Sequence, residues 1–156
     1  MKITIPQSDL QKALQVVASV VPGKTTLPVL TCVLMEAEGD SLTLSATNLD
    51  ISVTTRIDGL QIQESGRAAV PAGKFVSFVR SLSAGEVVMT EKKGKFDVKS
   101  GKASFSESSM NADEFPSLPV LGEGNGLEVS SNVLVRMIKT TAYAVSKDET
   151  RPALMG

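Results

Sequence analysis

The sequence predicts an α+β fold in which helices lie on antiparallel sheets. Most segments alternate apolar and polar residues with period two, and three others carry apolar residues at helical spacing. The chain also begins again near its end, because Ile5 to Leu30 aligns without gaps on Val129 to Leu154, an offset of 129 − 5 = 124 residues. A period of this length is that of a whole domain.

The repeat sets the expected domain organisation. Six of its 26 aligned positions are identical: Leu10/Leu134, Ala18/Ala142, Val21/Val145, Thr26/Thr150, Pro28/Pro152 and Leu30/Leu154. Prolines and glycines are frequent between Pro116 and Gly126, as in a linker. We therefore expect a first domain over 1–122, a linker over 123–126, and the truncated start of a second domain over 127–156.

Strands are expected where the alternation is regular. The clearest cases are Lys2 to Ile5, Ser41 to Ser45, Ile51 to Thr54 and Lys95 to Lys99. Residues typical of turns lie between such segments, at Glu38-Gly39-Asp40, Lys93-Gly94 and Ser100-Gly101. This order indicates short hairpins within antiparallel sheets, each with one apolar face.

Helices are expected over Gln7 to Val20, Gly73 to Leu82 and Ser131 to Ala144. Ser8 or Asp9 is a candidate N-cap of the first helix, and Asn132 of the third. A weak inner repeat relates the first two helices: Ile5-Pro6 matches Val70-Pro71 at an offset of 65, with Leu10 on Phe75 and Leu14 on Val79. It predicts that one domain consists of two βαβββ halves, each with a helix on an antiparallel sheet.

The composition favours a non-catalytic protein. The chain has no histidine and one cysteine, which argues against a histidine-based nucleophile and against a zinc site, so neither a metal nor another cofactor is expected. Cys32 lies in an apolar run and is expected to be buried and inert. The sequence shows neither a secretory leader nor an apolar run long enough for a membrane span, which favours a cytoplasmic protein.

Basic residues dominate the predicted helices, whose only acid is Asp9. The basic side chains of these helices are Lys12, Lys74, Arg80, Arg136 and Lys139. Because they fall outside the apolar stripes, they would face away from the sheets. A positive helix surface and an ordinary solvated helix face both fit this pattern.

The motifs of the chain together resemble those of the bacterial DNA sliding clamps, the beta subunits of DNA polymerase III. The resemblance rests on Met1 to Ile5, Thr26 to Leu30, Thr47-Asn48-Leu49-Asp50, Val70 to Phe75, Ser100-Gly101-Lys102 with Phe105, and Glu114-Phe115-Pro116. It implies the DNA-clamp fold, with three domains in a full-length chain. Two chains would form a homodimeric ring that encircles duplex DNA, with basic helices lining the hole and acidic sheets outside.

The resemblance also implies roles for single residues. Lys24, after the first helix, falls where the family carries a basic residue that contacts DNA. The resemblance implies DNA contacts for five further residues as well: Lys12, Lys74, Arg80, Arg136 and Lys139. Lys74, Lys102 and Phe105 match the dimer interface. Arg151 and Leu154 match part of the pocket that binds DNA polymerase III and the clamp loader.

Two functions therefore remain open. The first is a non-catalytic processivity factor in DNA replication, a subunit of a polymerase (nucleotidyltransferase) holoenzyme. The second is a stand-alone, β-rich module that binds a protein partner through an exposed sheet edge.

Overall fold

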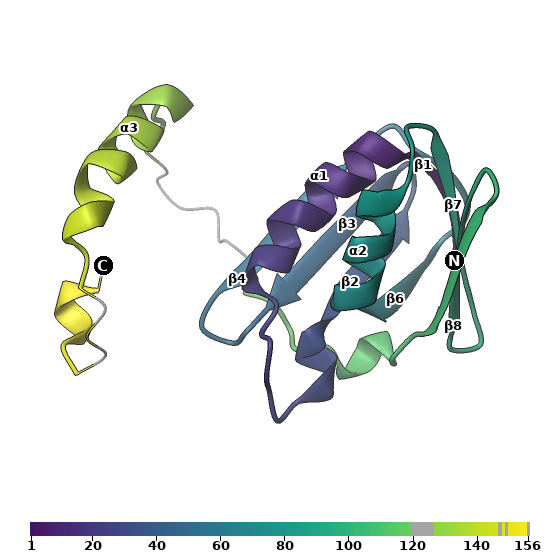
Figure 1. Ribbon diagram of the computed structural model, residues 1–156, viewed down its shortest axis with the longest axis horizontal. Helices are drawn as coiled ribbons and strands as arrows, with labels where there is room; N and C mark the ends of the chain where they lie inside the picture. Colours follow the sequence, from purple (N-terminus) through teal and green to yellow (C-terminus); the bar gives the residue numbers. More distant parts are fainter. Residues whose placement is uncertain (120–126, 147, 149, 156) are drawn as a thin grey trace. The chain divides into compact units, whose positions relative to one another are not determined.

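The computed structural model describes residues 1–119, 127–146, 148 and 150–155. The chain divides into two compact units, Met1–Pro119 and Val120–Gly156. The expected linker over 123–126 lies outside the described residues, and the assignment of 127–156 to a second domain stays a prediction. Figure 1 shows the first unit with its strands and two long helices, and the second with α3.

The first unit contains nine strands and two α-helices in its described residues. The strands are β1 (Lys2–Pro6), β2 (Cys32–Glu38), β3 (Ser41–Thr47), β4 (Ser52–Ile57), β5 (Gln61–Glu64), β6 (Gly66–Pro71), β7 (Glu86–Lys92), β8 (Lys95–Ser100) and β9 (Ala103–Ser108). The helices are α1 (Gln7–Val17) and α2 (Ala72–Ser81), with 3₁₀ turns at Ala18–Val20, Pro28–Thr31 and Ala112–Glu114. The second unit contains α3 (Ser131–Thr141) and 3₁₀ turns at Ala142–Ala144 and Pro152–Leu154.

The strands form two antiparallel sheets. Sheet A has the order β5-β1-β7-β8-β9, and sheet B has the order β4-β3-β2-β6. Apart from β5, the chain order is β1-α1-β2-β3-β4 followed by β6-α2-β7-β8-β9, which confirms the two predicted βαβββ halves. The short polar strand β5 was not expected from the sequence.

Each half gives its first strand to the sheet of the other half. Strand β1 pairs with β7 in sheet A, and β6 pairs with β2 in sheet B. The two helices lie side by side over the sheets (Figure 1). They run antiparallel, because the Gln7 side-chain amide near the start of α1 donates to the Val79 carbonyl near the end of α2, at 3.0 Å.

The main core lies between the helices and the two sheets. Leu10 and Leu14 of α1, with their repeat partners Phe75 and Val79 of α2, are buried in it. The Phe75 ring meets the Phe96 ring of β8 edge-on, with 5.2 Å between centroids. This contact joins α2 to sheet A at the centre of the unit.

Strand β2 is buried on both faces, which explains why its sequence does not alternate. Val33 and Met35 face the main core, whereas Cys32 and Leu34 face a second cluster. That cluster is covered by Phe115 and its neighbours, which lie over the outer side of sheet B. Cys32 is fully buried, as expected, and burial raises the pKa of its thiol.

Two features of the helix ends differ from the sequence expectation. The N-caps are Pro6 for α1 and Ser130 for α3, so Ser8, Asp9 and Asn132 are not N-caps. A side-chain cap is dispensable in α1 because β1 runs directly into the helix. The backbone N–H of Gln7, at the helix start, donates instead to the Gly85 carbonyl at 2.8 Å. In the described parts of the chain, no helix is both long and apolar enough to cross a membrane.

Replacing Phe75 with alanine should lower the free energy of unfolding of the first unit by about 3–5 kcal/mol, because it removes a fully buried ring. Val16→Ala on the half-exposed side of α1 is the control, with a change of about 0.5 kcal/mol or less. Urea unfolding followed by circular dichroism measures both. Equal losses would contradict the position of Phe75 at the centre of the core.

Candidate nucleic-acid interface

The basic residues predicted on the first two helices lie on their exposed side. Lys12 of α1 and Lys74 and Arg80 of α2 are exposed, while the apolar positions between them are buried. Their neighbours on the same side are mostly serine and glutamine, including Gln15 and Ser77. The two helices therefore present a polar surface with an excess of positive charge, which we call the helix face.

The antiparallel packing places the end of α1 beside the start of α2. A hollow of about 400 Å³ lies there, lined by Ala18, Val21, Pro22, Gly23, Thr31, Ala72, Gly73 and Val76. Lys24 and Lys74 directly follow two of these lining glycines. A Cβ added at Gly23 or Gly73 would have no neighbouring atom within 4 Å. Both glycines therefore face open space.

The start of α2 adds a partial positive charge at this end. The helix has no side-chain N-cap and no acid in its first turn. Its first backbone amides are therefore oriented toward any group that approaches the helix N-terminus. An anion such as a phosphate is favoured at a helix N-terminus. The nearby ammonium of Lys74 is paired with Glu107 of β9.

The other basic residues of the helix face occupy two crevices. Arg80 lies with Gln11 and Gln15 in the crevice between the helices. Lys12 shares a hollow of about 280 Å³ with Arg56 of β4, a residue that the sequence analysis did not single out. Arg56 Nε donates a hydrogen bond to Asp58 Oδ1 at 2.6 Å, and this bond raises the pKa of Arg56, so the guanidinium stays charged.

The residues expected at a dimer interface lie at the edge of sheet A. The Phe105 ring of β9 stacks on the Phe78 ring, with 5.2 Å between centroids, and Lys102 is exposed in the β8–β9 turn. The ammonium of Lys74 donates to Glu107 Oε2 of the same chain at 3.0 Å. Lys74 thus joins the first turn of α2 to the unpaired edge of β9.

The remaining predicted residues belong to the second unit. Arg136 and Lys139 are exposed on α3, and so is Leu154 in the last 3₁₀ turn. The Arg151 guanidinium pairs with Asp148 at 3.5 Å. Hydrogen bonds from Thr150 lower the pKa of that aspartate, which keeps the pair ionised.

Metal chemistry has no support in the described residues. Within the ranges given above, no three histidine, cysteine, aspartate or glutamate side chains are grouped so that they could hold a metal ion. The arrangement on the helix face can instead make contacts with anions. Its cations are flexible lysines for the most part, which act as point charges and recognise no particular base.

Residues 1–119 match the family model described as DNA polymerase III beta subunit, N-terminal domain. The chain belongs to this family. A beta sliding clamp from Caulobacter vibrioides is 36% identical over 160 residues, covering all of this chain and 42% of that protein. The beta sliding clamp of Bacillus subtilis is 30% identical over 164 residues, again with all of this chain covered and 43% of the relative.

Solved structures of family members have the same fold. The crystal structure of the DNA polymerase sliding clamp from Bacillus subtilis superposes with a TM-score of 0.91 at 30% identity, covering 97% of this chain and 42% of that one. The crystal structure of the clamp from Caulobacter crescentus superposes with a TM-score of 0.90 at 34% identity, covering 99% of this chain and 42% of that one. The DNA-clamp fold predicted from the sequence is thereby confirmed. This chain spans about two fifths of the length of the relatives it matches.

The expectation of acidic sheets outside is wrong for sheet A. The side chains that point away from the helices include four lysines, namely Lys2, Lys92, Lys95 and Lys99. The expectation rested on the charges of the helices alone, although the period-two pattern of β8 already places Lys95 and Lys99 on one face. Glu38 and Asp40 lie at the β2–β3 turn, close enough to act on Arg56.

A double-mutant cycle on Lys74→Met and Glu107→Gln should give a coupling energy of about 0.2–1 kcal/mol that falls at high salt. The value is small because the Lys74 side chain is 76% exposed, although that of Glu107 is only 24% exposed. Urea unfolding of the four proteins measures it. Zero coupling at low salt would contradict a persistent ion pair.

Proposed function

We propose that this chain supplies a first clamp domain, 1–122, and the start of a second, 127–156, to a DNA sliding clamp. The assembled clamp would encircle duplex DNA and hold the replicative DNA polymerase on its template. The proposal is supported most directly by the family match over 1–119, taken with the basic residues on the helix face. Chromosome replication would place this role in the bacterial cytoplasm.

The chemistry of the helix face suits a clamp that slides. A ring holds DNA by topology, so its inner surface needs few contacts, and these should ignore the base sequence. Lys24 and Lys74 lie at one end of the helix face, and Arg80 lies at the other. Lysine ammonium groups on long, mobile stems exchange phosphates readily as the duplex moves. Lys24 is our best single candidate for a DNA contact.

The edge of sheet A suits ring closure. Among the described strands, β9 has a partner on one side only, so its other edge has unpaired backbone groups. Phe105, Lys74 and Lys102 lie at or beside this edge, where a second copy of the full-length protein would dock to form the homodimer. The intramolecular Lys74–Glu107 pair would then have to open, or to accept a further charged group from the partner.

The second unit would contribute to the binding of DNA and of other proteins. Arg136 and Lys139 of α3 would contact DNA, by the same repeat that relates α3 to α1. Arg151 and Leu154 would form part of the pocket for DNA polymerase III and the clamp loader. In this account the chain is a non-catalytic subunit of the polymerase holoenzyme, and nucleotidyl transfer belongs to the polymerase.

Duplex DNA should shift amide resonances of α1, α2 and the Lys24 loop when it is added to the ¹⁵N-labelled chain at low salt. Two duplexes of unrelated sequence should give the same pattern, because phosphates are the contacts. Lys24→Glu with Arg80→Glu should abolish the shifts, since two attractive charges become repulsive. Titration by NMR is sensitive enough for the weak affinity that a sliding contact requires.

The matched control is Lys92→Glu with Lys93→Glu, which makes the same change in net charge away from the helix face. This variant should keep the DNA-induced shifts. Loss of the shifts in both variants would mean that only net charge matters. Persistence of the shifts in the Lys24 and Arg80 variant would contradict the proposal and favour the protein-binding module.

A further inference from the structure

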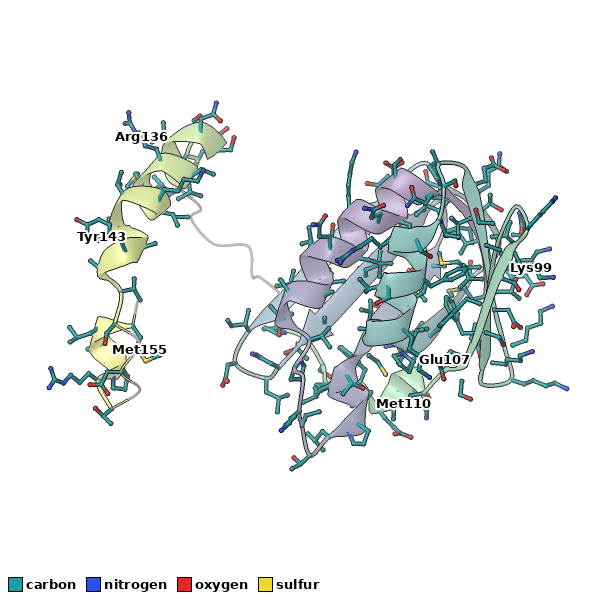
Figure 2. The ribbon with its side chains drawn as sticks, viewed as in Figure 1. Lys99, Glu107, Met110, Arg136, Tyr143 and Met155 are labelled. Atoms are coloured by element: carbon teal, nitrogen blue, oxygen red, sulfur yellow. The ribbon has the colours of Figure 1, made fainter. Side chains whose placement is uncertain are left out.

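The outer face of sheet A carries four lysines, and none of the DNA contacts proposed above lies on it. The strand register aligns the outward-facing residues of neighbouring strands in rows that cross the sheet. One row contains Lys2, Thr90, Asp97 and Ser106, and a second contains Thr4, Val88, Lys99 and Ser104. In a third row, Lys92 pairs with Lys95. Side chains at these positions alternate with the buried ones, so they point away from the helices. Figure 2 shows Lys99 on this side.

This face is hollowed. A depression of about 820 Å³ is lined by Lys2, Val88, Thr90, Lys92, Lys95, Asp97, Lys99, Ser104, Phe105 and Ser106, with the buried Val98 beneath. Four lysines, three hydroxyls and the apolar side chain of Val88 thus meet in one place. The volume is in the range of sites that hold a small ligand or a short segment of chain.

Two of the four lysines that line the depression, Lys92 and Lys95, are paired with acids. Asp97 is the one acid in its lining. A hydrogen bond from Ser106 and the charge of Lys95, at 3.4 Å, lower the pKa of this carboxyl group. Lys92 is paired with Glu64 at 3.5 Å, and Glu86 lies at the end of β7. Among the described residues, no acid lies within ion-pair distance of Lys2 or Lys99.

We propose that the outer face of sheet A binds an extended, acidic segment of a partner protein. Carboxylates of the segment would meet the lysines, and its backbone amides would donate to Asp97 and to the hydroxyls of Thr90, Ser104 and Ser106. Aliphatic parts of the segment would cover Val88. This surface lies on the other side of sheet A from the helix face, so the inference does not rest on the proposed DNA contacts.

Nucleic acid fits the depression less well. Single strands bind sheets chiefly by stacking bases on exposed aromatic rings. The one aromatic residue of the lining, Phe105, stacks on Phe75 and Phe78 inside the unit. An entering phosphate would meet the ionised Asp97. A peptide also has backbone amides that can donate to this carboxylate, whereas a backbone phosphate has no hydrogen-bond donor.

The test is an NMR titration of the ¹⁵N-labelled chain with a short peptide of alternating glutamate and serine, and with the same peptide carrying glutamine for glutamate. The acidic peptide should shift the amides of Thr90, Asp97, Lys99, Ser104 and Ser106, and the glutamine peptide should not. Shifts confined to α1 and α2, or equal shifts with both peptides, would overturn the proposal.

Two charge-matched variants complete the test. Lys95→Glu with Lys99→Glu should weaken binding of the acidic peptide roughly tenfold or more. Lys12→Glu with Arg80→Glu should leave the affinity for the acidic peptide within about twofold of the unchanged chain, while weakening the binding of duplex DNA. The dispersion of each spectrum reports whether the variant is folded. Equal loss in both variants would mean binding by net charge alone and would overturn the proposal.

Two further outcomes would also overturn it. If duplex DNA shifts the sheet A resonances more strongly than the acidic peptide does, the depression is a nucleic-acid site. If dilution of the chain alone changes the same resonances, the occupant is the acidic β2–β3 turn of a second copy, with Glu38 and Asp40. A concentration-independent spectrum with peptide-specific shifts supports the proposal.

Discussion

The structure of the first unit depends on one constraint, the exchange of first strands between its two halves. Neither half can complete its sheet alone, because β1 lies in sheet A beside β7 and β6 lies in sheet B beside β2. Each helix directly follows an exchanged strand, so both helices are drawn over the same core. The Phe75–Phe96 contact then ties the helix of the second half to its own sheet. Folding of the halves is therefore expected to be one cooperative event.

The same constraint determines which surfaces remain available. Because α1 and α2 bury their apolar stripes in one core, their lysines and Arg80 are left together on the helix face. The outer side of sheet B is covered by the second apolar cluster around Phe115. The outer side of sheet A is left open with its lysines. One small unit thus has two basic surfaces on opposite sides of a sheet, with different shapes and different chemistry.

Most of the fold could be predicted from the sequence, because its strands and helices differ in apolar period. Leu10 on Phe75 and Leu14 on Val79 correctly indicated the two halves, but a sequence repeat cannot tell which sheet takes an exchanged strand. The N-cap of α1 was wrong because tertiary hydrogen bonds at Gln7 replaced the local ones. The basic face of sheet A was missed because its lysines come from three strands, β1, β7 and β8. Only the strand register brings Lys2, Lys92, Lys95 and Lys99 onto one surface.

Topological retention on DNA tests the central claim most directly, that Met1–Pro119 is a clamp domain. Residues 1–119 would replace the corresponding domain of the Caulobacter clamp, and the purified chimera would be loaded onto circular DNA by the clamp loader. The account predicts that the chimera co-elutes with the circle in gel filtration and is released when the DNA is cut once. Release from the intact circle, or retention after cutting, would contradict it.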